Sequence, residues 1–336
     1  MDQVNINNSE YCVGNTPLVL VQSLTKSLGF HVWAKLEGSN PGQSIKDRIV
    51  TFMLDRAELK GDLVRGKGTI VEASSGNTGH SLAMVAANRG YKAIIVVKDN
   101  CTKEKIFFIK LLGAEVVTCP AGLPSDHPDS YYEKAKSIAA SLEDGYYLNQ
   151  NYNEMNYLAH YKCLGPEIIT QMGENSIDYI IASCSTGGTL SGVGRAMKAH
   201  NKNIKVIGAD SVGSSLSVEF YDRGDANKKT IISGLGKDIV PSNFKKEYID
   251  AMVTVDDQRC IQHIHDLAKY DGIIAGGSSG ATVDALKQIA HKIPKDSNVV
   301  LIFADHGSKY MSTYFNQEWL DRKLKKKQPI PILPKL

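Results

Sequence analysis

Apolar residues recur along the chain with two alternating periods, one helical and one typical of strands. The run at residues 93–97 is continuously apolar and mostly β-branched, as expected of a strand buried on both faces. Around it the pattern predicts helices near 49–59, 78–89 and 103–112, and strands at 69–72, 93–97 and 115–118. Strands that alternate with helices indicate βαβ units and a parallel sheet.

A second α/β series follows an interruption rich in proline. Pro120, Pro124 and Pro128 mark residues 118–130 as a loop or a crossing between lobes. The further predicted helices are near 130–142, 161–172, 188–200, 257–270 and 280–291, and the further strands are at 18–21, 31–35, 146–148, 178–182, 205–209, 252–255 and 298–303. Two α/β series predict two lobes with a cleft between them, where small ligands commonly bind.

The composition fits an ordinary globular protein of 336 residues, with 42% hydrophobic and 22% charged residues. A net charge of +3 is too small to suggest a nucleic-acid partner. No apolar run approaches the roughly 18–20 residues of a membrane helix. Residues 1–5 lack the basic and apolar regions of a signal peptide, and no Cys-x-x-Cys pair occurs. We therefore expect a cytoplasmic protein with no membrane partner. No metal-ligand spacing is evident, so no metal site is predicted.

One lysine lies between a turn and a helix start. Asn40, Pro41 and Gly42 have turn chemistry, and the helical spacing begins just after Lys46. We expect Ser44 to cap this helix and Asp47 to favour its dipole. A helix N-terminus favours a neutral amine, which can attack an aldehyde to form a Schiff base. A solvated lysine at a helix start is the other interpretation, and local features alone do not separate the two.

Three further stretches combine glycines with hydroxyl residues beside predicted helices. They are Ser74-Ser75-Gly76-Asn77-Thr78-Gly79, Cys184-Ser185-Thr186-Gly187-Gly188-Thr189 and Gly276-Gly277-Ser278-Ser279-Gly280. With the lysine turn, and in this order, they resemble the fold-type-II pyridoxal-phosphate (PLP) enzymes of the cysteine synthase and cystathionine β-synthase family. The resemblance runs from about Val13 to about Ser312.

The resemblance implies an architecture and a cofactor. It implies an α/β fold of two lobes, each with a largely parallel sheet flanked by helices, and PLP in the cleft between them. Residues 1–47 with 151–336 would form the larger, PLP-binding lobe, and residues 48–150 a smaller lobe that closes over the substrate. A homodimer that acts on small-molecule amino acids is also implied.

The resemblance also assigns the cofactor contacts. Lys46 would bind the aldehyde and act as the catalytic base. Ser278 would face the pyridine nitrogen and Asn77 would lie beside the 3′-oxygen. The phosphate would lie in the loop formed by Ser185, Thr186, Gly187, Gly188 and Thr189. The family usually has glycine where Ser185 stands, so this turn departs from the pattern. Taken alone, such a loop is a weak signal, although glycines and a helix start do suit an anion.

The substrate contacts follow in the same way. The carboxylate of the amino acid would be bound by Ser74, Ser75, Gly76 and Thr78, and Gln150 matches a glutamine that also reaches this carboxylate. Gly234 opens a further substrate-binding segment, in which Lys237 stands where the cystathionine β-synthase branch usually has tyrosine. A lysine there could meet an anionic group on the incoming nucleophile.

The activity implied is β-replacement on L-serine or an O-activated serine through an aminoacrylate. Residues 102–105, 126–130 and 208–214 resemble the cystathionine β-synthase branch most, which implies homocysteine as nucleophile and cystathionine as product. Three alternatives remain open: a cysteine synthase using O-acetylserine and sulfide, a diaminopropionate-type synthase using an amino-acid amine, and a serine or threonine dehydratase. Outside this class, a binding protein that has lost catalysis would keep the cofactor but turn over no serine derivative.

Overall fold

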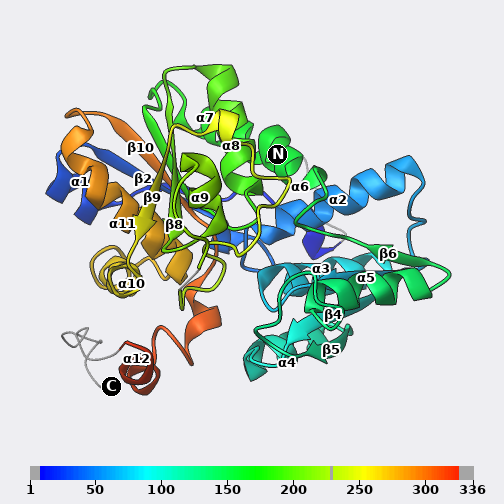
Figure 1. The fold of residues 1–336 in the computed structure, drawn as a ribbon. Coiled ribbons are helices and arrows are strands. Elements are labelled where there is room, and N and C mark those ends of the chain that lie inside the picture. Colours follow the sequence, from blue (N-terminus) through cyan, green and yellow to red (C-terminus); the bar gives the residue numbers. More distant parts are fainter. Residues whose placement is uncertain (1–7, 228–229, 325–336) are drawn as a thin grey trace. The chain divides into compact units, whose positions relative to one another are not determined.

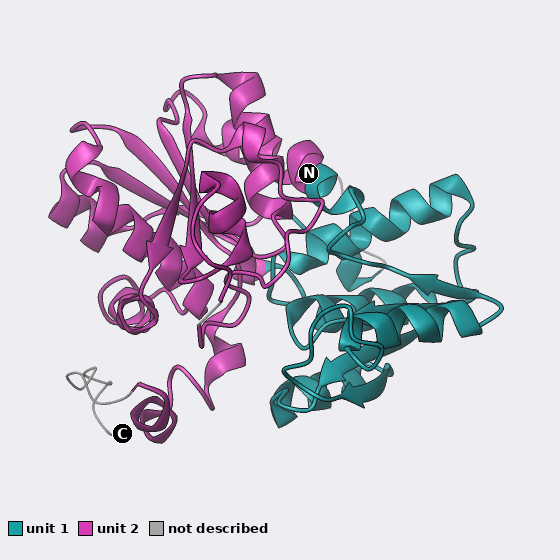
Figure 2. Ribbon diagram, in the orientation of Figure 1, with its two compact units in different colours: residues 1–15, 40–159 teal, residues 16–39, 160–336 magenta. Residues whose placement is uncertain are grey.

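The computed structural model describes residues 8–227 and 230–324, and the chain forms two compact units. The first unit contains Met1–Asn15 and Asn40–Ala159, and the second contains Thr16–Ser39 and His160–Leu336 (Figure 2). The smaller lobe was predicted over residues 48–150, whereas the smaller unit also includes residues 40–47 and 151–159, and Lys46 therefore belongs to it. The expectation about the first five residues lies outside the part that the structure describes.

The smaller unit is built on a parallel sheet with the strand order β5-β4-β3-β6 (Figure 1). Its strands are β3 (Thr69–Ala73), β4 (Lys92–Lys98), β5 (Glu115–Cys119) and β6 (Gly145–Tyr147). Its helices are α2 (Lys46–Lys60), α3 (Asn77–Arg89), α4 (Lys103–Leu111), α5 (Tyr131–Ser141) and α6 (Met155–Ala159).

Both faces of this sheet are covered. Ile70 of β3 packs in a core with residues of α2, α3 and α4, whereas Val71 packs in a second core with α5. Successive strand residues point to opposite faces, so Ile70 and Val71 pack against helices on opposite sides of the sheet. The continuous burial of β4 at residues 95–97 confirms the prediction of a strand buried on both faces.

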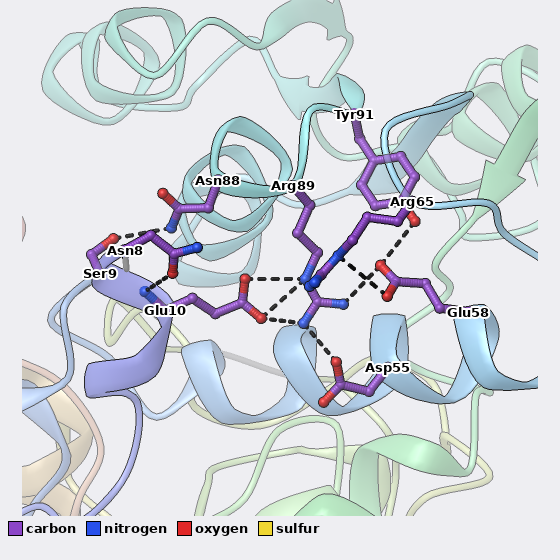
Figure 3. A network of polar contacts seen from close by, with 9 residues as sticks. All are labelled: Asn8, Ser9, Glu10, Asp55, Glu58, Arg65, Asn88, Arg89 and Tyr91. Carbon is purple, nitrogen blue, oxygen red and sulfur yellow. Dashed lines mark hydrogen bonds and ion pairs between the residues drawn. The ribbon is translucent and has the colours of Figure 1, made fainter. Parts of the chain in front are cut away.

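A buried cation joins the N-terminal segment to this unit. Arg89, at the end of α3, contacts Glu10, Asp55 and Glu58, and its side chain is only 1% exposed (Figure 3). Its Nη1 donates to Glu58 at 2.9 Å, and the hydroxyl of Tyr91 donates to the same oxygen at 2.9 Å. Burial works to lower the pKa of Arg89, but Glu10 and Asp55 outweigh it and hold that pKa above its ordinary value. The acids thus compensate the buried charge.

The larger unit contains a six-stranded sheet with the order β1-β2-β10-β7-β8-β9, in which only the β1–β2 pair is antiparallel. Its strands are β1 (Leu18–Leu20), β2 (His31–Leu36), β7 (Tyr179–Ser183), β8 (Lys205–Ser211), β9 (Ala251–Val255) and β10 (Asn298–Phe303). Its helices are α1 (Gln22–Leu28), α7 (Gly165–Met172), α8 (Gly188–His200), α9 (Ser215–Tyr221), α10 (Asp257–Asp271), α11 (Gly277–Ile289) and α12 (Gln317–Lys323).

The predicted elements occur in both units, with small differences at their ends. The predicted helix near 161–172 is divided, because residues His160–Leu164 form a π-helical turn before α7. Pro166 is the second residue of α7, which directly follows this π-helical turn. The short helices α9 and α12 were not predicted, since seven residues give too few helical periods to detect.

Candidate active site

Lys46 is the first residue of α2, directly after a tight turn. The turn is closed by a hydrogen bond from Gln43 N to Asn40 O at 2.7 Å, and Gln43 has a left-handed φ of 57°. Ser44 Oγ accepts from Lys46 N at 3.1 Å, so the expected hydroxyl contact is present although Ile45 occupies the cap position. Lys46 is half-buried while the next four residues are buried. The backbone that carries the amine is therefore fixed.

Asp47 fastens this turn to α3. Its carboxylate is fully buried and accepts from Gly42 N at 2.6 Å and from Ser81 Oγ at 2.5 Å. A Cβ added to Gly42 would lie 2.3 Å from Asp47 Oδ1, so only glycine permits this approach. The role expected for Asp47 was an interaction with the helix dipole. The structure shows in addition that it joins two segments of the smaller unit.

The loop at residues 74–78 connects β3 to α3. Ser74 Oγ accepts from Gly76 N at 3.3 Å and Gly79 N at 3.1 Å, and Ser75 Oγ accepts from Lys98 N at 2.8 Å. A hydroxyl that accepts from the backbone keeps its own hydrogen to donate. The cap of α3 is Gly76, with no side-chain cap, and a Cβ there would meet open space. Hydroxyl hydrogens and a helix start together suit a carboxylate.

Gln150 is joined to this loop by its side chain. Its Oε1 accepts from Thr78 Oγ1 at 2.6 Å, and its Nε2 donates to Glu72 Oε1 at 3.0 Å. All three residues are buried. Burial, followed by the negative charge of Glu72, raises the pKa of the neighbouring Tyr147. The structure thus brings Gln150 to the predicted carboxylate loop through a contact with Thr78.

In the larger unit, the loop at residues 184–189 connects β7 to α8. Its conformation depends on Gly187, which has a φ of 83° and would place a Cβ only 2.6 Å from Phe244 Cα. Gly187 is the cap residue of α8 and no side chain caps this helix. Gly187 and Gly188 are buried, as is Thr186, while Ser185 and Thr189 are half-buried. A buried helix start without a side-chain cap fits a phosphate, because its first N–H groups lack intrahelical acceptors.

The remaining predicted residues also lie in the larger unit. Ser278 is in the first turn of α11, is 6% exposed and follows Gly276, another cap without a side-chain hydrogen bond. Gly234 is exposed, with a φ of 78° and open space around it. The segment that follows is tied to the phosphate-loop candidate, because Gly236 N donates to Cys184 O at 2.7 Å. Lys237 N donates to Ser214 Oγ at 3.1 Å.

Each unit therefore carries part of the predicted set. The smaller unit contains Lys46, Asn77, Gln150 and the carboxylate-loop candidates, and the larger unit contains Ser278, Gly234 and the phosphate-loop candidates. Within the described parts of the chain, no cluster of three or more His, Cys, Asp or Glu could hold a metal ion. Over the same residues, no helix is both long and apolar enough to cross a bilayer.

Sequence reasoning missed three residues that support these loops. Glu72 was overlooked, although an acid inside a buried strand signals a paired carboxylate. His160 Nε2 lies 3.2 Å from Thr189 Oγ1, and Phe244 packs against Gly187. The last two are far from their partners in sequence, so no local pattern could reveal them.

The pyridoxal-phosphate dependent enzymes are the protein family that matches the chain, over residues 10–305. The chain belongs to this family. The predicted cofactor class and the α/β fold class are thereby confirmed. The uncapped, buried start of α8 also fits the phosphate of PLP, and Lys46 at a fixed helix start fits its aldehyde. The roles of individual residues remain predictions.

Relatives within this PLP family carry related names. Cystathionine β-synthase of Saccharomyces cerevisiae is 35% identical over 92% of this chain and 63% of its own length. Cysteine synthase 1 of Emericella nidulans is 35% identical over 95% of this chain and 87% of its own length. The chain spans about three fifths of the length of the cystathionine β-synthases of yeast, Apis mellifera (61%) and Dictyostelium discoideum (61%).

Two solved structures of PLP-family enzymes have the same fold. The O-acetylserine dependent cystathionine β-synthase of Helicobacter pylori matches with a TM-score of 0.82 and 32% identity, over 92% of this chain and 98% of that chain. O-ureido-L-serine synthase matches with a TM-score of 0.85 and 30% identity, over 96% of this chain and 97% of that chain.

Proposed function

We propose that this protein catalyses a PLP-dependent β-replacement on L-serine or an O-activated serine, with homocysteine as the nucleophile and cystathionine as the product. The observation that carries the proposal is a pair of helix starts, those of α3 and α8, each with a glycine cap and no side-chain cap. One suits the carboxylate of an amino acid and the other the phosphate of the cofactor. Cystathionine β-synthases among the relatives support the choice of nucleophile.

PLP supplies an aldehyde that captures amines and a ring that withdraws electrons from Cα. Lys46 holds the cofactor and then removes and returns the proton at Cα of the amino acid. Residues 185–189 would bind the phosphate, Asn77 would lie beside the 3′-oxygen, and Ser278 would face the ring nitrogen, where a neutral hydroxyl would leave that nitrogen unprotonated. Ser74, Ser75, Gly76, Thr78 and Gln150 bind the substrate carboxylate, and Gly234 belongs to the same substrate site. The smaller lobe closes during turnover and excludes water.

A second candidate, cysteine synthase using O-acetylserine and sulfide, is favoured by the Emericella relative, because the chain covers most of that protein. Lys237 supports a further candidate, a diaminopropionate-type synthase, because its ammonium group could pair with the carboxylate of an amino acid whose amine is the nucleophile. Its backbone is fixed on both sides, since its N–H donates to Ser214 Oγ and its carbonyl accepts from Ser215 N at 2.8 Å.

A product screen tests these candidates. The purified protein is offered serine, O-acetylserine and O-phosphoserine, each with sulfide, homocysteine or amino-acid amines, and the products are identified by mass spectrometry. Cystathionine as the main product is the expected result. Cysteine alone would establish the second candidate, and pyruvate from serine without a thiol would show a dehydratase.

We also propose that the protein is a cytoplasmic homodimer. The dimer is proposed from the family resemblance, and the compartment from six cysteines of which none forms a disulfide. Sedimentation equilibrium should give the mass of two chains, and fractionation of the source cells should recover the protein with soluble cytoplasmic enzymes. A single-chain mass at micromolar concentration would contradict the dimer.

A further inference from the structure

Residues 230–233 belong to no helix or strand, and the predicted substrate-binding segment begins directly after them. Backbone N–H and C=O groups in such a stretch need partners outside a regular ladder. Asp257, in the first turn of α10, accepts from Ile231 N at 2.7 Å and from Thr230 Oγ1 at 2.6 Å. Thr230 Oγ1 in turn accepts from Ile232 N at 3.0 Å. Side chains therefore fix the first half of this stretch to α10.

The hydroxyl group of Tyr314 binds the same stretch from a later part of the chain. It donates to Ile231 O at 3.1 Å and accepts from Ser233 N at 2.6 Å. A phenol can make both bonds, because its one oxygen carries a hydrogen as well as lone pairs. Burial raises the pKa of Tyr314, so the phenol keeps its hydrogen for the carbonyl group of Ile231.

Tyr314 is itself firmly held. Its residue is 2% exposed, and its ring stacks on that of Tyr310 with the centroids 4.7 Å apart. Its carbonyl oxygen lies 2.8 Å from Nε2 of His265, a buried residue of α10. A Cβ added to Gly277 would lie 2.9 Å from the Tyr314 ring, so this ring packs on the start of α11, directly before Ser278. One tyrosine thus contacts both the start of α11 and the irregular stretch.

Gly234 is exposed and lies between two stretches that hydrogen bonds fix. Before it, residues 231–233 are bound to Tyr314, and after it Gly236 N donates to Cys184 O at 2.7 Å. Glycine has more backbone freedom than any other residue, so its neighbours decide where its peptide groups point. The bonds to Tyr314 therefore bear directly on the position of Gly234.

We propose that Tyr314 is a positioning residue for the binding of the nucleophile. Its hydroxyl fixes residues 231–233 to the start of α11, so that Gly234 and Lys237 are in place before the nucleophile arrives. The inference rests on the proposed function, because it assigns the segment from Gly234 to Lys237 to the nucleophile. It adds a residue that acts through the backbone of another segment.

Tyr314→Phe tests this inference, because it keeps the ring and removes only the hydroxyl. We expect KM for homocysteine to rise about tenfold, since binding must then also order residues 231–234. KM for serine and the affinity for PLP in a fluorescence titration should change less than twofold, because the ring still packs on the start of α11. Without substrates, the PLP-loaded variant should exchange its amide hydrogens faster at residues 231–234, as read by mass spectrometry.

Tyr221→Phe is the matched control. Tyr221 also belongs to the larger unit, and its hydroxyl donates to Met252 O at 2.8 Å and accepts from Met252 N at 3.1 Å. This variant loses the same two kinds of bond at β9, so we expect a lower melting temperature and a native KM for homocysteine. If Tyr314→Phe also loses thermal stability but keeps the native KM for homocysteine, its role is structural alone and the inference is overturned.

Thr230→Val covers the case in which Tyr314→Phe does not fold. Valine has the shape of threonine but can neither donate to Asp257 nor accept from Ile232 N. We expect KM for homocysteine to rise about threefold and KM for serine to stay within twofold of native. A native KM for homocysteine would overturn the inference, because the order of this stretch would then not affect the nucleophile. Failure of the proposed function would instead appear in the native protein, as absence of turnover of every serine derivative.

Discussion

The polar groups at the two ends of α3 differ in the partners that the protein gives them. At the start, Gly76 leaves the first N–H groups without a side-chain cap, beside hydroxyls that still have hydrogens to donate. At the end, Arg89 is surrounded by Glu10, Asp55 and Glu58 (Figure 3). The end of the helix is satisfied within the protein and contributes stability. The start has the features that suit an anion, which agrees with the proposed carboxylate site.

The larger unit repeats this contrast between two of its helices. α10 is capped by Asp256, whose side chain accepts from Arg259 N at 3.0 Å, and this cap residue is exposed. α8 has a buried glycine cap and no side-chain cap. We propose that a helix start with a side-chain cap serves the fold and that one without such a cap receives a ligand. The following variants test that division.

Lys46→Ala should have the largest effect. Without the amine that holds the cofactor and moves the proton, turnover should fall by about three orders of magnitude. Sodium borohydride should fix cofactor mass to the native chain but not to the variant, as read by mass spectrometry. Lys60→Ala, at the exposed other end of α2, is the control and should behave as native. Native turnover by Lys46→Ala would contradict the proposed role of Lys46 as the catalytic base.

Arg89→Met should be the most destabilising change at the satisfied end of α3. It removes the buried cation from Glu10 and Glu58, whose side chains are mostly buried, which costs about 3–5 kcal/mol of unfolding free energy. Urea unfolding measures this loss. At a temperature where the variant is folded, its KM for the amino acid should match that of the native protein. A raised KM without loss of stability would contradict the assignment of this end to structure.

Gly187→Ala should damage the start of α8. A left-handed φ and a Cβ 2.6 Å from Phe244 Cα would force the turn to move. Affinity for PLP should fall at least about tenfold in a fluorescence titration, whereas affinity for pyridoxal, which lacks the phosphate, should not change. Gly272→Ala, at the end of α10, has a similar φ but open space, and should lower stability alone. Equal losses for both ligands would argue against a phosphate site.

Asp256→Ala should have the smallest effect. Loss of the cap of α10 should cost about 1 kcal/mol of unfolding free energy. The affinity for PLP and the KM for the amino acid should remain native, because α10 starts at a site with no proposed ligand. Thermal unfolding and a cofactor titration measure the two quantities. A weaker cofactor affinity would show that the division between helix starts is too simple.

Much of the fold could be predicted because helices and parallel strands of ordinary length carry their own period. The strand at residues 298–303 was predicted with the limits observed. Long-range pairing was not visible. Lys35, for example, is fully buried on β2 because its Nζ donates to Thr16 O, Gln171 and Glu167, which are up to 136 positions away. A single sequence shows such a lysine only as a polar residue in a strand.

The candidate site divides in the same way. Glycine–hydroxyl turns next to helices could be recognised, since the chemistry of an anion site lies within a few consecutive residues. His160 and Phe244 could not be assigned, because each contacts a turn that lies far from it in the sequence. The pairing of Glu72 with Gln150, 78 positions apart, needs the parallel registers of β3 and β6.

The hydrogen bond from Ser81 to Asp47 joins the lysine turn to α3, the helix whose start would receive the carboxylate. Both segments belong to one compact unit. Lys46 and the start of α3 keep the same positions relative to each other if the two units move during turnover. Their spacing is therefore a property acquired during folding, and the arrival of the amino acid has no need to create it.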